Sequence, residues 1–204
     1  TIFYHVCEQG TDEWHSLRLG IVTASRFSEA ISKGAGRKSY MLELASEVLT
    51  GKAKAGFSSA AMEWGTETEP QARSCYDFMT SNDVSEVGFV TNDKVPGVGV
   101  SPDGLIDDSG LIEIKCPNTS THIDYLLQNK LPAKYKAQVH GQLWITGREW
   151  CDFVSFDPRV IDPEKQLFVY RVTRDEGYIT TLREGVTAFR EELNKLLIKL
   201  GVSE

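Results

Sequence analysis

A pair of strand-like segments joined by a short turn limits the possible folds of this chain more than any other feature of its sequence. Residues 97–106 and 111–116 carry valine, leucine and isoleucine at strand-like spacing, and Asp107-Asp108-Ser109-Gly110 between them has the composition of a tight turn. The sequence therefore predicts a β-hairpin. Pairing about this turn places Asp103 within one residue of the position opposite Glu113, at cross-strand distance.

The two faces of the second strand differ in chemistry. Because side chains alternate along a strand, Glu113 and Lys115 share one face, while Ile112 and Ile114 share the other and indicate burial on at least one side. Asp103, Glu113 and Lys115 then converge on one patch. Two neighbouring carboxylates repel each other unless a cation lies between them, and Mg²⁺ suits one or two carboxylates plus water. The alternative is an ordinary surface hairpin with an exposed Glu/Lys face.

The charge of the chain is unevenly distributed. A net charge of −7 argues, taken alone, against a nucleic-acid partner. However, residues 56–113 hold eleven acids against two bases, whereas residues 10–55 and 114–150 each carry a small excess of bases. The acidic stretch is either a solvated face or a cation site whose basic neighbours meet an anion.

Composition places the chain among ordinary globular proteins. It has 204 residues, of which 41% are hydrophobic and 25% charged, and no internal repeat or linker, so we expect one α/β domain over residues 1–204. No apolar run is long enough to span a membrane, and no signal peptide opens the sequence. The four cysteines stand far apart without a C-x-x-C pair, which favours a reduced, cytoplasmic setting over a zinc site or a disulfide framework.

The periodicity predicts helices and further strands around the hairpin. Helices are expected at residues 11–18, from about 23–25 to 31, at 40–49, 59–79, 121–129, 132–145 and 175–200, with Pro70 as a kink or boundary. Residues 33–38 are expected to form a flexible basic loop. Strands are expected at 84–91, 97–106, 111–116, 151–156 and 167–173.

Two further places could contact an anion or a substrate. A helix that begins near Thr23 or Ser25 offers free N–H groups to a phosphate, and Arg18 adds a two-pronged contact, although Arg18 could instead pair with Asp12 or Glu29. Gln138 and Gln142 are i,i+4 neighbours on one helix face, where they either orient water or a phosphate or are structural. The four histidines have no metal-ligand spacing and are interpreted as structural or exposed.

The hairpin residues Pro102-Asp103 and Glu113-Ile114-Lys115 resemble the signature of the PD-(D/E)xK nucleases. Over residues 10 to about 175 the chain also resembles the bacteriophage lambda exonuclease, or YqaJ-like viral recombinase, family of phage and prophage alkaline exonucleases. The matching motifs, in the family's order, are Trp14-His15-Ser16-Leu17-Arg18-Leu19-Gly20, Thr23-Ala24-Ser25, Trp64-Gly65 with Glu69, Ser101-Pro102-Asp103-Gly104, Glu113-Ile114-Lys115-Cys116-Pro117 and Ala137-Gln138-Val139.

This resemblance implies a fold and roles for individual residues. The expected fold is an α/β, restriction-endonuclease-like core with a central mixed β-sheet flanked by helices. Asp103, Glu113 and the Ile114 carbonyl would bind the metal, and Lys115 would help to activate the attacking water. Glu69 matches a carboxylate near the metals, and Gln138 matches an active-site glutamine. The residues that match the pocket for the 5′ phosphate of a DNA end, or lie beside it, are Arg18, Ser25, Thr23 and Trp14.

The resemblance also implies an activity. It is that of an exonuclease that digests linear double-stranded DNA from a 5′-phosphorylated end to mononucleotides and leaves a 3′ overhang. The enzyme would depend on Mg²⁺, with two ions per site, and Mn²⁺ could substitute. The family forms a homotrimer ring and works with a single-strand annealing protein, here in the bacterial cytoplasm. The alternatives are a structure-specific or restriction-like endonuclease of the same fold, a glycosidase with Asp103 and Glu113 as its two carboxyls, and a non-catalytic DNA-end-binding module.

Overall fold

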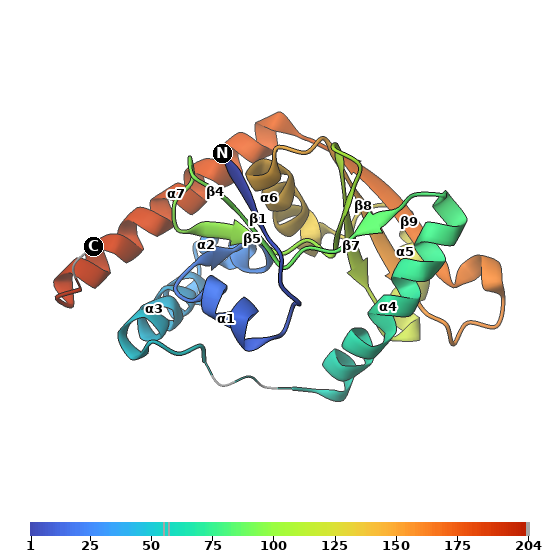
Figure 1. Ribbon diagram of the computed structural model, residues 1–204, viewed down its shortest axis with the longest axis horizontal. Coiled ribbons are helices and arrows are strands. Elements are labelled where there is room, and N and C mark those ends of the chain that lie inside the picture. Colours follow the sequence, from blue (N-terminus) through green and yellow to red (C-terminus); the bar gives the residue numbers. More distant parts are fainter. Residues whose placement is uncertain (55, 57, 203–204) are drawn as a thin grey trace.

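The computed structural model of the chain describes residues 1–54, 56 and 58–202 and has mixed α/β architecture (Figure 1). The mixed α/β class expected from the sequence is confirmed. The strands are divided between two sheets: a four-stranded sheet of order β1-β4-β5-β2 and a five-stranded sheet of order β3-β6-β7-β8-β9. Within the described part of the chain, we find no helix long and apolar enough to cross a membrane.

The four-stranded sheet consists of β1 (Ile2–His5), β2 (Val22–Thr23), β4 (Phe89–Asn92) and β5 (Val98–Val100). Strands β1 and β4, like β4 and β5, pair antiparallel, whereas β2 pairs parallel to β5. The sequence did not predict β1, which is partly exposed and lies at an edge of the sheet. This sheet places the carboxyl end of β5 directly before Ser101 and Pro102.

The five-stranded sheet contains the predicted hairpin. Its strands are β3 (Val84–Ser85), β6 (Gly104–Ile106), β7 (Gly110–Lys115), β8 (Trp150–Phe156) and β9 (Leu167–Thr173). The antiparallel pairs Gly104↔Ile112 and Ile106↔Gly110 confirm the hairpin and its register. Strand β8 continues the sheet parallel to β7, and β9 closes it antiparallel to β8.

Two segments that were predicted as single strands are each shared between the sheets. Residues 84–91 divide into β3 and β4, and residues 97–106 divide into β5 and β6. Pro102 lies at the second break, where its missing N–H removes a donor that a continuous strand would use. At the first break Gly88 packs so closely on Cys7 that a Cβ would lie 2.3 Å from its sulfur. The chain therefore crosses between the sheets immediately before Asp103.

Helices cover both sheets, and their bounds are α1 (Asp12–Arg18), α2 (Phe27–Ala30), α3 (Ala35–Thr50), α4 (Ala60–Thr80), α5 (Thr119–Gln128), α6 (Lys136–Thr146) and α7 (Glu176–Lys199), with 3₁₀ turns η1 (Ala24–Arg26), η2 (Ala133–Tyr135) and η3 (Pro163–Lys165). Helices α2, α3, α6 and α7 pack together with β4 and β5 in the largest core cluster. Helix α4 packs Ala72 and Tyr76 against Ile112 and Ile114 of β7 in a second core.

Three sequence predictions about helices need correction. Residues 33–38 do not form a loop throughout, because α3 already begins at Ala35. Pro70 does not end α4, which runs on to Thr80. The second predicted helix is short: a 3₁₀ turn over Ala24–Arg26 leads into the four residues of α2.

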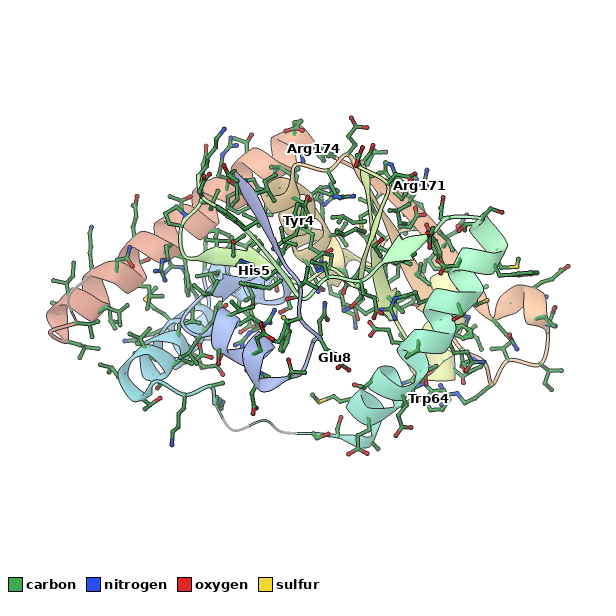
Figure 2. The ribbon with its side chains drawn as sticks, viewed as in Figure 1. Tyr4, His5, Glu8, Trp64, Arg171 and Arg174 are labelled. Atoms are coloured by element: carbon green, nitrogen blue, oxygen red, sulfur yellow. The ribbon has the colours of Figure 1, made fainter. Side chains whose placement is uncertain are left out.

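Helix α4 is tied at its far end to the five-stranded sheet by buried polar contacts. The Tyr76 hydroxyl donates to Asp152 at 2.5 Å, and Arg171 donates to both oxygens of the same carboxylate at 2.9 and 3.1 Å. Figure 2 shows Arg171 close to this end of α4 and Trp64 near the other end. These contacts and the packing of Ala72 hold the C-terminal half of α4 on the sheet, where Arg73 reaches Asp103 at the start of β6.

Candidate active site

The predicted hairpin places Asp103 beside β7, directly before the first residue of β6. The Asp103 amide donates to the Ile112 carbonyl at 3.1 Å, which extends the ladder by one residue beyond Gly104. The Asp103 carboxylate then accepts from the Ile114 amide at 2.7 Å. Asp103 therefore lies opposite Glu113, as the register argument predicted.

Glu113 and Lys115 lie on the same face of β7, as alternation predicted. The Glu113 residue is only 3% exposed, and its Oε1 atom lies 3.2 Å from the Lys115 ammonium. The Lys115 Nζ atom also lies 4.6 Å from the centre of the Tyr135 ring. The alternative of a solvated Glu/Lys surface is therefore wrong for this hairpin.

Helix α6 supplies two neutral donors to the buried carboxylate. Gln138 donates to Glu113 Oε1 at 3.1 Å, and Gln142 donates to Oε2 at 2.9 Å. On the same helix Gly141 packs on Phe27, where a Cβ would meet the ring at 2.3 Å. Both glutamines thus act on Glu113 and hold its carboxylate in one orientation.

Helix α4 places Glu69 and Arg73 beside Asp103. Arg73 donates from Nη2 to the Asp103 carbonyl at 3.1 Å, and the same nitrogen lies 3.7 Å from Glu69 Oε2. Sequence reasoning missed Arg73, although its i,i+4 spacing from Glu69 was a visible signal. It also missed Tyr135 as the ring under Lys115.

The electrostatics of the cluster follow from burial and from the charges. Burial, then the charges of Glu113 and Glu69, raise the pKa of Asp103 well above its usual range. Burial alone would lower the pKa of Lys115, but the negative charges of Glu113 and Asp103 outweigh it and raise the pKa. Burial, followed by the charges of nearby acids that include Glu69 and Asp103, raises the pKa of the Cys116 thiol to about 12. The site therefore has excess negative charge beside one fixed ammonium.

The donor set suits a hard divalent cation. Burial and the neighbouring charges of Glu113 and Glu69 raise the pKa of Asp103, and a cation would relieve the repulsion between these carboxylates. Glu113 Oε1 accepts from both Gln138 and Lys115, whereas Oε2 accepts from Gln142 alone and keeps a free lone pair. No group of three His, Cys, Asp or Glu side chains in the described residues forms a metal cage. Carboxylate and carbonyl oxygens with room for water are the ligands that Mg²⁺ accepts, and Asp103, Glu113, the Ile114 carbonyl and Glu69 as its ligands stay predictions.

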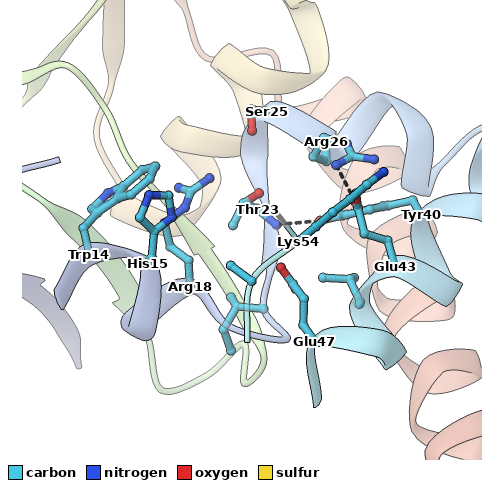
Figure 3. Close-up of a pocket in the computed structure, with 13 residues that line it drawn as sticks. Trp14, His15, Arg18, Thr23, Ser25, Arg26, Tyr40, Glu43, Glu47 and Lys54 are labelled. Carbon is cyan, nitrogen blue, oxygen red and sulfur yellow. Dashed lines mark hydrogen bonds and ion pairs between the residues drawn. The ribbon is translucent and has the colours of Figure 1, made fainter. Parts of the chain in front are cut away.

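A cavity of about 270 Å³ next to this cluster holds all four residues expected to lie at a 5′ phosphate (Figure 3). Figure 3 shows Trp14, His15 and Arg18 on one side of the cavity, with Arg26, Tyr40 and Glu43 on the other. Arg18 stacks 4.0 Å from the Trp14 ring centre. It does not pair with Asp12 or Glu29, because it donates to Ser101 Oγ at 2.7 Å.

Ser101 joins the cavity to the carboxylates. Its hydroxyl accepts from Arg18 and from the Trp14 indole N–H, the latter at 3.2 Å, and Asp103 follows two residues later. Sequence reasoning gave Ser101 no role of its own. The two groups of residues are therefore held in a fixed relation by one short segment of chain.

The helix N-terminus expected near Thr23 or Ser25 offers less to an anion than the sequence suggested. Thr23 is buried, and its amide already donates to the Tyr40 hydroxyl at 3.2 Å. Ser25 is exposed at the cavity on the 3₁₀ turn. Because α2 has only four residues, its dipole is small, and binding of an anion here would depend on side chains.

The histidines behave as expected where the structure shows their contacts. His122 is fully buried between Ser155 Oγ, at 2.7 Å, and the Lys165 carbonyl, at 2.8 Å. His140 contacts the Lys136 carbonyl at 3.0 Å on the side of α6 away from Glu113. Neither lies in the carboxylate cluster.

The fold, together with Asp103, Glu113 and Lys115 on one hairpin, defines a nuclease core of the PD-(D/E)xK type. Residues 13–149 match the YqaJ-like viral recombinase domain. The chain belongs to this family, and the resemblance found in the sequence is confirmed.

Solved structures agree with this assignment. The alkaline exonuclease LHK-Exo from Laribacter hongkongensis is 45% identical, with a TM-score of 0.89 over 94% of this chain and 96% of that one. LHK-Exo in complex with dAMP is 46% identical, with the same TM-score over 93% and 96% of the two chains. A phage-related exonuclease from Haemophilus somnus 129PT, 18% identical with a TM-score of 0.69 over 88% and 96%, shares the fold. The family and the two LHK-Exo structures support a nuclease.

Proposed function

We propose that this protein is a Mg²⁺-dependent exonuclease that digests linear double-stranded DNA from the 5′ end, releases mononucleotides and leaves a 3′ single-stranded overhang. The observation that carries this proposal is the linkage of two sites by Ser101-Pro102-Asp103. One end of this segment accepts a hydrogen bond from Arg18 of the cavity, and the other end carries the Asp103 carboxylate, which lies opposite Glu113. An end-binding pocket next to a hydrolytic centre is what removal of terminal nucleotides requires.

The residues around Asp103 divide the work of phosphodiester hydrolysis. Mg²⁺, or Mn²⁺ in its place, would supply a polarised water and neutralise charge on the scissile phosphate, and two ions per site would share these tasks. Asp103, Glu113 and the Ile114 carbonyl would hold the metal, with Glu69 close by. The Lys115 ammonium is fixed 3.2 Å from Glu113, where it can stabilise a nucleophilic hydroxide or the charge of the transition state. Gln138 and Gln142 keep Glu113 oriented.

The cavity around Arg18 would bind the 5′ phosphate. Burial lowers the pKa of Arg18 to about 10, so its guanidinium keeps its charge at neutral and mildly alkaline pH. Ser25 and Thr23 line the same cavity, and Trp14 holds Arg18 by stacking. The structure of LHK-Exo with dAMP supports a mononucleotide as the kind of product that fits an active site of this family.

Assembly and context are part of the proposal. A homotrimer ring would let an acidic chain of net charge −7 hold DNA, because its few basic residues could line a channel while acids face outward. A ring would also slow dissociation between turnovers. We propose a single-strand annealing protein as the partner that receives the 3′ overhang, and the bacterial cytoplasm as the setting.

Digestion of one linear duplex labelled separately at each 5′ and 3′ end tests the activity. In Mg²⁺ we expect early release of the 5′ label as a mononucleotide, late release of the 3′ label, and no activity in EDTA until Mg²⁺ or Mn²⁺ is restored. Closed circular DNA should stay intact. Nicking of the circle would support an endonuclease of the same fold instead, and binding of ends without turnover would support a non-catalytic module.

A further inference from the structure

Arg73 lies at the junction of three acidic elements of the site. Its side chain is only 14% exposed, although residues 56–113 are the most acidic part of the chain and contain no other base except Lys94. One guanidinium nitrogen donates to the Asp103 carbonyl and faces Glu69, and the other lies 3.3 Å from Glu86 Oε1. The guanidinium is therefore buried where three different segments meet.

We propose that Arg73 is a positioning residue that sets the spacing of Asp103 and Glu69 and so prepares the site for its divalent cation. This inference rests on the proposed function, because it assumes a metal held by Asp103 and Glu113. Arg73 contacts the backbone of Asp103 rather than its carboxylate, so it occupies neither carboxylate oxygen, one of which accepts from the Ile114 amide. The Arg73 nitrogen that contacts this backbone also lies 3.7 Å from Glu69 Oε2 and draws that carboxylate along the face of α4.

The shape of the side chain matters as much as its charge. Arginine presents several N–H groups in a rigid fork, whereas lysine is a single ammonium on a flexible stem. The observed contacts use two nitrogens in different directions at once. The Nε atom of Arg73 is buried without a hydrogen-bond partner among the described residues, which indicates that the guanidinium is held by its two outer nitrogens. Lysine could reach only one of these partners well.

Charge and positioning predict opposite effects, which makes the proposal testable. If Arg73 acted only through its positive charge, its removal would strengthen binding of a cation to the carboxylates, and Arg73→Lys would change little. If Arg73 positions the ligands, Arg73→Lys weakens cation binding although the charge is kept. Residues that orient metal ligands are typically worth about 10–100-fold in metal affinity.

The experiment measures Mn²⁺ binding to the DNA-free protein by electron paramagnetic resonance of the free ion. We expect Arg73→Lys and Arg73→Gln to bind Mn²⁺ at least about tenfold more weakly than the wild type. The concentration of Mg²⁺ that gives half-maximal digestion should rise in parallel, while kcat at saturating Mg²⁺ recovers. Lys94→Gln is the matched control, because it removes the only other base of residues 56–113 from an exposed position outside the site, and its Mn²⁺ affinity should stay within about twofold of wild type.

Two outcomes keep the inference separate from the proposed function. Wild-type or tighter Mn²⁺ binding in a folded Arg73→Lys or Arg73→Gln protein, checked by circular dichroism and thermal melting, would overturn the role of Arg73. Asp103→Asn should abolish Mn²⁺ binding. If it leaves binding unchanged, the metal site itself is wrong, whatever the Arg73 variants do.

Discussion

Replacement of Lys115 by methionine tests the centre of the proposed site. Methionine keeps most of the apolar stem over Tyr135 and removes the ammonium that lies 3.2 Å from Glu113. Removing one fixed donor that stabilises charge in a transition state costs about 10²–10³-fold in rate. We therefore expect kcat to fall by that factor, which corresponds to roughly 3–4 kcal/mol of transition-state stabilisation.

The same change should leave the protein folded. Removing one partner of a buried ion pair costs about 3–5 kcal/mol when the other charge is left alone. Here Glu113 keeps the amide donors of Gln138 and Gln142, and a quarter of the Lys115 side chain is exposed, so a cost nearer 1–3 kcal/mol is expected. A domain with the usual stability of about 5–15 kcal/mol tolerates that loss.

The assay is single-turnover digestion of 5′-phosphorylated linear duplex at saturating Mg²⁺, together with thermal melting. Lys134→Met is the matched control, because Lys134 also lies over the Tyr135 ring, at 5.0 Å, but is exposed. It should digest DNA at close to the wild-type rate. A Lys115→Met protein that digests within about threefold of wild type would refute the assignment, since the ammonium would then contribute little to stabilising charge in the transition state.

Two further variants test charge at the site. The pKa of Asp103 is raised in the native protein, so the native protein holds this proton more tightly than the unfolded chain does. The free energy of unfolding therefore falls as pH rises from the ordinary pKa of about 3.9 through the raised pKa. In calorimetry without metal, the melting temperature of Asp103→Asn should therefore exceed that of the wild type at pH 8 and equal it near pH 4. Equal melting temperatures at pH 8 would contradict this. Arg18→Ala should lose roughly 10–150-fold of the preference for a 5′-phosphorylated over a 5′-hydroxyl end in competitive digestion, since a charged hydrogen-bonded contact is worth about 1.5–3 kcal/mol. Arg37→Ala, which removes an ion pair with Glu192 away from the cavity, is its control, and an unchanged ratio in Arg18→Ala would remove Arg18 from this role.

The hairpin and its chemistry could be predicted from sequence because they depend on local rules. Strand alternation puts Glu113 and Lys115 on one face, and the turn fixes which residue lies opposite Glu113. Helical spacing likewise put Gln138 and Gln142 on one side of α6, and both donate to Glu113. In each case the relevant partners are set by a period that the sequence displays directly.

The division of the strands between two sheets and the role of Arg73 could not be predicted, because both depend on packing between distant segments. Pro102 is a local sign of a break in residues 97–106, but the assignment of β5 and β6 to different sheets is decided by their pairing with β4 and β7. Arg73 also looked like one more charge on a helix. Its contact with Asp103, 30 residues further along the chain, forms only when α4 packs against β7.

Ser101 offers the sharpest test of whether the two sites work as one. Its hydroxyl accepts from both Arg18 and Trp14, but the Trp14 indole N–H also donates to the Gly88 carbonyl at 2.9 Å, so Ser101→Ala leaves the Arg18 donor without its acceptor at a cost of about 1–3 kcal/mol. If this contact fixes the phosphate pocket relative to Asp103, the variant should show a raised KM for 5′-phosphorylated ends and a reduced preference over 5′-hydroxyl ends, with Mn²⁺ affinity unchanged. Ser28→Ala, an exposed serine on α2, controls for the loss of a hydroxyl. An unaltered end preference in Ser101→Ala would mean that Arg18 is positioned by its stacking on Trp14 alone.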